Sequence, residues 1–120
     1  MSVKLPKIDS YWYVATPYTN YCAGINNAYV GACSAVAYLI GYGHRNVYSP
    51  IAHCHAVAIH GGIDPLDWGL WMDVQEAMKK AAGGLLIVKM RGWEESKGIQ
   101  QETEYFSQGT RPIAYMDWPE

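Results

Sequence analysis

Ser96, Gly98 and Glu102 are the residues whose types and spacing best suit chemistry on a bound ligand. Ser96 stands where it can cap the start of a helix, and the free backbone N–H groups behind such a cap form an anion site. Gly98 allows a ligand to approach the backbone closely. Glu102 follows one turn later on the same helical face, where we expect the helix dipole to keep its carboxylate ionised, as a nucleophile requires. The alternative interpretation is an ordinary capped surface helix.

The elements that must position these residues alternate between strands and helices. Strands are predicted for four apolar stretches, at 11–16, 46–50, 85–90 and 112–116. Helices are predicted over 24–42, 68–82 and 98–108, with a short helix over 51–60 and loops over 61–65 and 91–97. This order predicts an α/β fold for a single domain over residues 1–120. We expect a Rossmann/flavodoxin-like three-layer sandwich, with a mostly parallel sheet of about four or five strands.

The carboxyl ends of parallel strands are where open α/β sheets bind ligands, so the site is expected there. Three segments meet this condition: Thr16-Pro17-Tyr18, residues 49–53 and residues 91–98. His53, in the second segment, either lines the substrate pocket or packs against neighbouring side chains. Tyr18 and Trp93 either provide flat walls for a planar ligand or belong to the core.

Composition excludes several classes of protein. Half of the 120 residues are apolar and the net charge is −2, which argues against a disordered tail and against a nucleic acid polymer as partner. No apolar run approaches bilayer length, and residues 1–10 lack the apolar core of a signal peptide. The three cysteines have unrelated spacings, so we expect no disulfide framework and a cytoplasmic location. Ten tyrosines and five tryptophans suit pockets for planar ligands or subunit interfaces.

Metal and cofactor motifs are weak in this sequence. His53, Cys54 and His55 lie close together, but no second pair at ligand spacing follows, so we expect no metal. Nothing in the pattern places a histidine and an orienting amide beside a nucleophilic cysteine. Neither a Gly-x-Gly-x-x-Gly nor a Walker-type sequence is present, so no cofactor is expected.

The Ser-x-Gly-x-x-x-Glu sequence after the 85–90 strand resembles the signature of nucleoside 2-deoxyribosyltransferases and related deoxynucleotide N-glycosidases. The stretch from Tyr13 to Tyr18 is similar to the opening strand of that superfamily, which ends in a small residue, a proline and an aromatic residue. Ser49-Pro50-Ile51, Trp71-Met72, Asp73 and Gly92-Trp93 resemble a small uncharacterised branch more closely. The similarity spans Tyr11 to Tyr115 in the correct order.

The resemblance implies a role for each matching residue. Glu102 would be the nucleophile that attacks the anomeric carbon, and Tyr13 would orient its carboxylate. Asp73 would contact the base or sugar, and Ser96 would bind a 5′-phosphate. Asp73 and Glu95 both qualify as the acid that protonates the leaving base. Relatives are homo-oligomers whose neighbouring subunits close each pocket, so a dimer or tetramer is expected.

Three departures from the superfamily pattern bear on the substrate and on catalysis. Glu95 stands where transferases usually carry an aspartate, and Glu104 stands where glycine is frequent. Another superfamily aspartate is replaced in the 82–84 stretch. The resemblance as a whole implies N-glycosidic bond cleavage in a (deoxy)nucleoside or its 5′-monophosphate, by hydrolysis or base exchange. The alternatives are a non-catalytic protein that captures a nucleotide or a nucleotide signal, and a structural oligomer.

Overall fold

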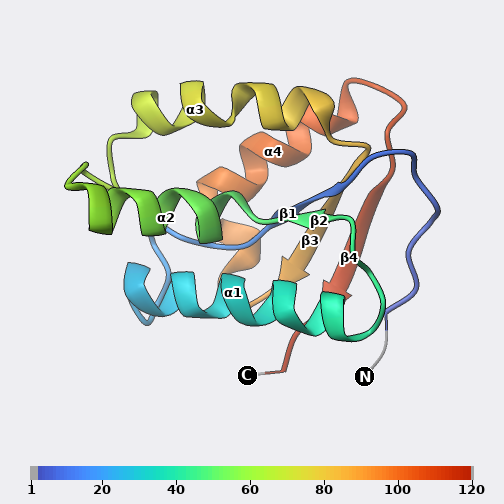
Figure 1. Ribbon diagram of the computed structural model, residues 1–120, viewed down its shortest axis with the longest axis horizontal. Coiled ribbons are helices and arrows are strands. Elements are labelled where there is room, and N and C mark those ends of the chain that lie inside the picture. The colour runs from blue at the N-terminus through green and yellow to red at the C-terminus, as the bar shows by residue number, and fades with distance from the viewer. Residues whose placement is uncertain (1–2, 120) are drawn as a thin grey trace.

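The computed structural model describes residues 3–119 as four long helices around a four-stranded parallel sheet (Figure 1). The strands are β1 (Trp12–Ala15), β2 (Val47–Tyr48), β3 (Gly84–Lys89) and β4 (Ile113–Asp117). The helices are α1 (Ile25–Gly41), α2 (Pro50–Gly61), α3 (Trp68–Ala81) and α4 (Lys97–Ser107), with a short 3₁₀ helix, η1 (Trp93–Glu95). The predicted α/β class and parallel sheet are confirmed.

The sheet has the order β2-β1-β3-β4, and every neighbouring pair is parallel. Trp12 pairs with Gly84 and Ala15 with Ile87, so β1 and β3 lie side by side at the centre. The chain leaves β1 toward one edge of the sheet and leaves β3 toward the other. Their carboxyl ends therefore form a topological switch point, which is where sheets of this kind open a crevice for ligands.

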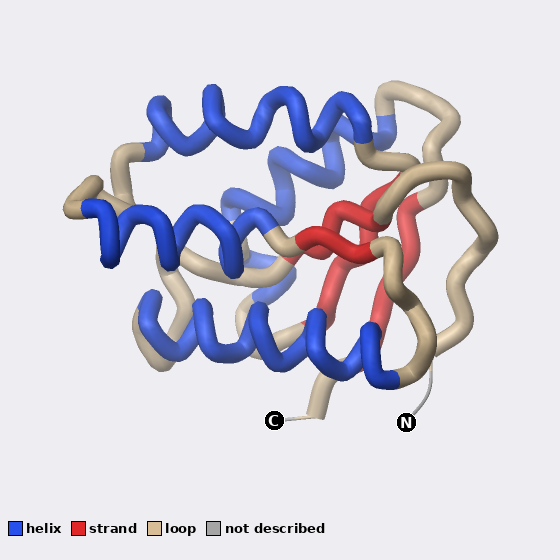
Figure 2. Tube along the Cα trace, in the orientation of Figure 1, coloured by secondary structure: helices blue, strands red, loops and turns tan. Residues whose placement is uncertain are grey.

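Two hydrophobic clusters cover the two faces of the sheet. Trp12, Val14 and Leu86 pack with α1 on one face, whereas Tyr13 and Ile87 pack with α4 on the other. Figure 2 shows α1 on one side of the strands and α3 with α4 on the opposite side. Alternate residues of the central strands thus face opposite helical layers, as the two-residue period of a strand requires.

The helix boundaries follow capping chemistry. Ser49 accepts a hydrogen bond from the Ala52 N–H at 3.0 Å and caps α2, which confirms the short helix predicted after the second strand. Asp67 caps α3 and accepts a hydrogen bond from the Leu70 N–H at 3.4 Å. The segment predicted as a loop over 91–97 contains η1, and the second strand is shorter than predicted, with two residues. Within residues 3–119, no helix is long and apolar enough to cross a membrane.

Gly84 allows the close approach of β3 to its neighbours. A Cβ atom at this position would lie 2.6 Å from a ring carbon of Trp12 and 2.9 Å from the Pro112 carbonyl oxygen. We predict that Gly84→Ala lowers the free energy of unfolding by about 1–3 kcal/mol, because overpacking must displace a buried ring and a backbone. Gly61→Ala is the matched control, since an added Cβ there meets nothing within 4 Å. Urea unfolding of both variants tests this, and equal stability of the two would contradict it.

Candidate active site

A pocket of about 860 Å³ opens at the carboxyl ends of β1, β2 and β3, where the topological switch point lies. Its size falls in the range typical of small-molecule sites. The wall is formed by residues 16–20 after β1, the first turns of α2, the inner face of α3 and the segment from Arg91 to Glu102. The structure therefore has a cavity of this size at the predicted location of the site.

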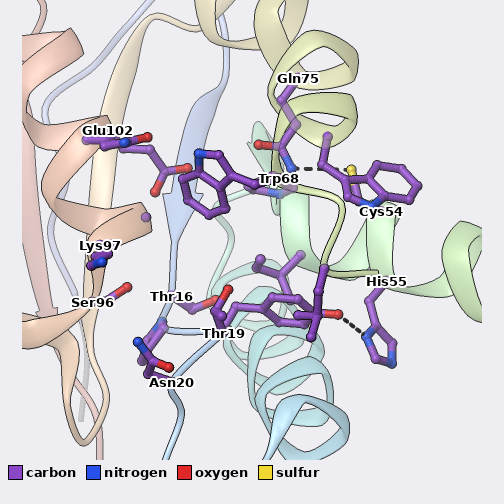
Figure 3. A pocket seen from close by; sticks show the side chains of 18 of the residues that line it. Thr16, Thr19, Asn20, Cys54, His55, Trp68, Gln75, Ser96, Lys97 and Glu102 are labelled. Atoms are coloured by element: carbon purple, nitrogen blue, oxygen red, sulfur yellow. Dashed lines mark hydrogen bonds between the residues drawn. The ribbon is translucent and has the colours of Figure 1, made fainter. Parts of the chain in front are cut away.

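Glu102 extends from α4 toward this pocket, beside the indole of Trp68 (Figure 3). Behind it lies Tyr13, which is fully buried and packs its ring against Phe106 of α4 and Tyr48 of β2. The Tyr13 hydroxyl donates to Gln75 Oε1 at 3.1 Å and also hydrogen-bonds with the Glu102 carboxyl group. The structure thus brings Glu102 and Tyr13 together, as the sequence analysis expected.

The single proton of the Tyr13 hydroxyl links the protonation state of Glu102 to the hydrogen bonds of Tyr13 and Gln75. While Glu102 is protonated, its own O–H can donate to Tyr13, and Tyr13 can donate to Gln75. Once Glu102 ionises, Tyr13 can turn its proton to the carboxylate, which gains a charge-assisted hydrogen bond. The Gln75 amide nitrogen donates to Cys54 Sγ at 3.3 Å, so the chain of hydrogen bonds reaches α2.

Burial dominates the electrostatics of Glu102 and raises its pKa to about 8, while the positive charge of Lys79 and the hydrogen bond from Tyr13 act in the opposite direction. The expectation that the helix dipole holds this carboxylate ionised is therefore wrong. Glu102 is the sixth residue of α4, and the influence of the dipole falls off within the first turn. Loss of hydration destabilises the charged carboxylate by more than the distant helix terminus stabilises it.

The N-terminus of α4 forms one wall of the pocket, with Glu95, Ser96, Lys97 and Gly98. Ser96 caps the helix and accepts a hydrogen bond from the Ile99 N–H at 3.3 Å. Trp68 lies near Gly98, where an added Cβ would be in ordinary van der Waals contact with the indole at 3.8 Å. Glu95, Ser96 and Gly98 were candidate site residues, whereas Lys97 was not singled out from the sequence.

The segment after β1 contributes Thr16, Pro17 and Tyr18 to the pocket, as predicted. The Tyr18 hydroxyl and His55 Nδ1 form a 2.6 Å hydrogen bond, drawn in Figure 3. Burial lowers the pKa of His55, so its neutral imidazole can accept a hydrogen bond from the Tyr18 hydroxyl. Thr16 is 5% exposed, and its Oγ1 has no hydrogen-bond partner within residues 3–119.

Tyr13 lies behind Glu102 rather than in the pocket wall, and three further candidate residues do not line the pocket. Asp73 is exposed on α3, because Trp71, Met72, Gln75 and Lys79 occupy the face that lines the cavity.

His53 is exposed beside the Tyr48 ring, and His55 faces the pocket in its place, because residues two apart in a helix lie on different sides of it. Trp93 packs against Tyr115 and under the ammonium group of Lys89, away from the cavity. The flat walls come instead from Trp68 and Trp71, together with Tyr18.

Gln75, Lys79, Cys54 and His55 are site residues that the sequence analysis did not assign to the pocket. The helical period could have identified Gln75 and Lys79, because Met72, Gln75 and Lys79 recur at steps of three and four residues. Within the described residues, no group of three His, Cys, Asp or Glu side chains is placed to hold a metal ion.

The fold and the site together define an α/β protein with a ligand-sized pocket and a partly buried carboxyl group at the switch point of a parallel sheet. The family described as "Domain of unknown function (DUF1937)" matches residues 10–118, so the chain belongs to this family. No curated protein matches the sequence.

The raised pKa of Glu102 predicts a pH-dependent cost to stability. The folded state binds this proton more tightly than the unfolded chain, whose carboxyl titrates near 4.5, so stability falls as the pH rises from about 4.5 to about 8. We predict that Glu102→Gln is more stable than the wild type at pH 8.5 by roughly 3 kcal/mol, because each pKa unit corresponds to about 1.4 kcal/mol and pocket water screens part of the effect. At pH 4.5 the two proteins should be nearly equal.

Urea unfolding at the two pH values measures this difference. Glu104→Gln is the control, because Glu104 is an exposed residue of the same helix. A stability difference between Glu102→Gln and the wild type that does not change with pH would contradict the prediction.

Proposed function

We propose that the protein cleaves the N-glycosidic bond of a nucleoside or nucleoside 5′-monophosphate, with Glu102 as the nucleophile. The observation that carries this proposal is the Glu102 carboxyl group in the pocket, hydrogen-bonded by the buried Tyr13. The Ser-x-Gly-x-x-x-Glu resemblance to nucleoside 2-deoxyribosyltransferases adds to it. A carboxylate held by a neutral donor beside an apolar wall can attack an electron-poor anomeric carbon.

The reaction is a double displacement. The Glu102 carboxylate forms a bond to the anomeric carbon while the C–N bond breaks, and its electron pair leaves with the base, which takes up a proton. Water then hydrolyses the glycosyl ester and releases the sugar, or a second base displaces it. Of the two acids considered as proton donors, only Glu95 lines the pocket.

The end of the cavity at the start of α4 suits an anionic group of the substrate. The start of α4 presents free backbone N–H groups beside Ser96, and the side chains of Lys97 and Arg91 line the same wall. These groups favour a 5′-phosphate on the sugar. The aromatic side chains of Trp68 and Trp71 provide planar surfaces for a base.

A binding-only function is the second candidate, and the pKa of Glu102 is the observation that favours it. With a pKa of about 8, most of the Glu102 population is protonated at neutral pH. A protonated carboxyl group donates a hydrogen bond to a ligand and does not attack it. Such a protein would capture a nucleotide or nucleotide signal without cleaving it.

The first test is base release from each common nucleoside and 5′-monophosphate, both ribo and deoxy, followed by chromatography. We predict that one class of substrate releases its base and that Glu102→Ala reduces the rate by at least about 10³-fold, since the nucleophile is lost. Glu104→Ala on the same helix should keep wild-type activity. No release by the wild type, together with a nucleotide-induced rise in melting temperature, would establish the capture function instead.

Thr16 gives a separate test of the pocket as a binding site. Its unpartnered Oγ1 lies against the cavity and can pair with a ligand. We predict that Thr16→Val keeps or raises the melting temperature of the free protein, because an unsatisfied buried hydroxyl is removed. The same change should weaken nucleotide binding about tenfold, measured by calorimetry. Unchanged affinity would show that the hydroxyl does not contact the ligand.

The proposal also includes a homo-oligomer in the cytoplasm. Apolar side chains are exposed along α2, α3 and the segment between them, including Ile59, Leu66 and Val74. Burial of such side chains between subunits is typical of homo-oligomers. Light scattering of the purified protein measures the number of subunits.

A further inference from the structure

Lys79 is a buried cation that has no role in the reaction as proposed so far. It lies in the last turn of α3 and is 6% exposed. Its ammonium group is 3.7 Å from the carboxylate of Glu76, which is itself half exposed to solvent. Burial of an ammonium group is costly, and one long contact to a solvated carboxylate offsets that cost only in part.

The ammonium group of Lys79 lies against the face of α4 that carries Glu102. It is 5.0 Å from the centre of the Tyr105 ring. Tyr105 follows Glu102 by three residues, so the two share one face of the helix. Lys79 and Glu102 also line the same pocket, and the charge of Lys79 acts directly on the Glu102 carboxyl group.

Arg111 fixes this end of α3 against α4. Its guanidinium group donates to the carbonyl oxygens of Lys79 at 2.8 Å and Ala82 at 3.0 Å. The same group lies 4.3 Å from the centre of the Phe106 ring and 5.3 Å from that of Tyr105. The backbone of Lys79 is therefore held at α4 by contacts that are independent of its own side chain.

We propose that Lys79 is the positioning residue for the nucleophile: its ammonium group is the fixed positive charge that stabilises the Glu102 carboxylate. This inference rests on the proposed function. Lys79 acts through Glu102 and needs no contact with the substrate. It supplies the ionised form that attack on the anomeric carbon requires, in a location where burial favours the neutral acid.

The other titratable groups around Glu102 do not supply this charge. Burial raises the pKa of the Tyr13 phenol on β1 and of the Cys54 thiol on α2, so both are neutral at pH 7. On α3, Glu76 carries the opposite sign and pairs with Lys79. The remaining charged groups of the pocket lie on the segment leading into α4: Arg91, Glu95 and Lys97.

The test compares Lys79→Met and Lys79→Arg with Lys80→Met, a control at the exposed neighbouring lysine. Protein labelled with ¹³C at the glutamate carboxyl carbons is titrated by NMR, and the Glu102 signal is identified by its loss in Glu102→Gln. We expect the Glu102 midpoint to rise by about one pH unit or more in Lys79→Met, because the counter-charge is gone. Lys79→Arg and Lys80→Met should stay near the wild type.

Steady-state kinetics provide the second readout. The acidic limb of the kcat profile should move with the NMR midpoint, so that kcat at pH 7 falls about tenfold in Lys79→Met and recovers toward high pH. KM should change little. A loss of kcat that is equal at every pH would indicate a structural role and overturn the inference, and so would an unchanged midpoint in a variant with a native circular dichroism spectrum. A shifted midpoint in a protein without activity would support the coupling and refute the proposed function.

Discussion

The burial of one carboxyl group is the constraint on which the arrangement of the site depends. A carboxyl group away from water must find hydrogen-bond donors or positive charge, or it remains protonated. Tyr13 from β1 and Lys79 from α3 meet this requirement only in part, because burial still raises the pKa of Glu102 to about 8. Tyr13 lies on β1, which pairs with β3 and packs against α4, and Arg111 holds the backbone of Lys79 at the end of α3 close to α4. The contacts that build the core therefore also place the groups that set the electrostatics of the site.

The same geometry explains why the pocket combines an apolar wall with charged groups. The switch point between β1 and β3 leaves a space that α2 and α3 enclose from one side and the start of α4 from the other. Trp68 and Trp71 come from α3, whereas Lys97 and the free N–H groups come from α4. The nucleotide that we propose as substrate has the matching division between a planar base and a phosphate, and the proposed reaction requires its sugar to lie beside Glu102.

The sequence predicted the fold well, because its signals were strong and local. Prolines and glycines bound the strands, and the periodicity from Ile25 to Leu39 is that of a helix with one buried face, as α1 has. Ser96 was a clear helix cap, and the opening-strand resemblance named Tyr13. The position of the pocket followed from the rule for the carboxyl ends of parallel strands. These features depend on neighbours in the sequence or on topology.

The wrong assignments concern which side of a helix faces the site. Asp73 and Gln75 are two residues apart, which in a helix turns them to different sides, and only packing against α2 shows that Gln75 faces inward. His53 and His55 differ in the same way on α2. The electrostatic error about Glu102 arose because a sequence shows the distance to a helix terminus but not the depth of burial. Lys79 could not be recognised as a site residue for the same reason.

A covalent sugar on Glu102 would be the most direct evidence that this residue is the nucleophile. The protein is mixed with its substrate, or with a 2-fluoro-substituted analogue that slows both chemical steps, quenched in acid and digested for mass spectrometry. If Glu102 is the nucleophile, the peptide containing Glu102 gains the mass of the glycosyl group, and the Glu102→Gln variant gains none. Base release by Glu102→Gln at the wild-type rate, or a sugar attached to another residue, would contradict it.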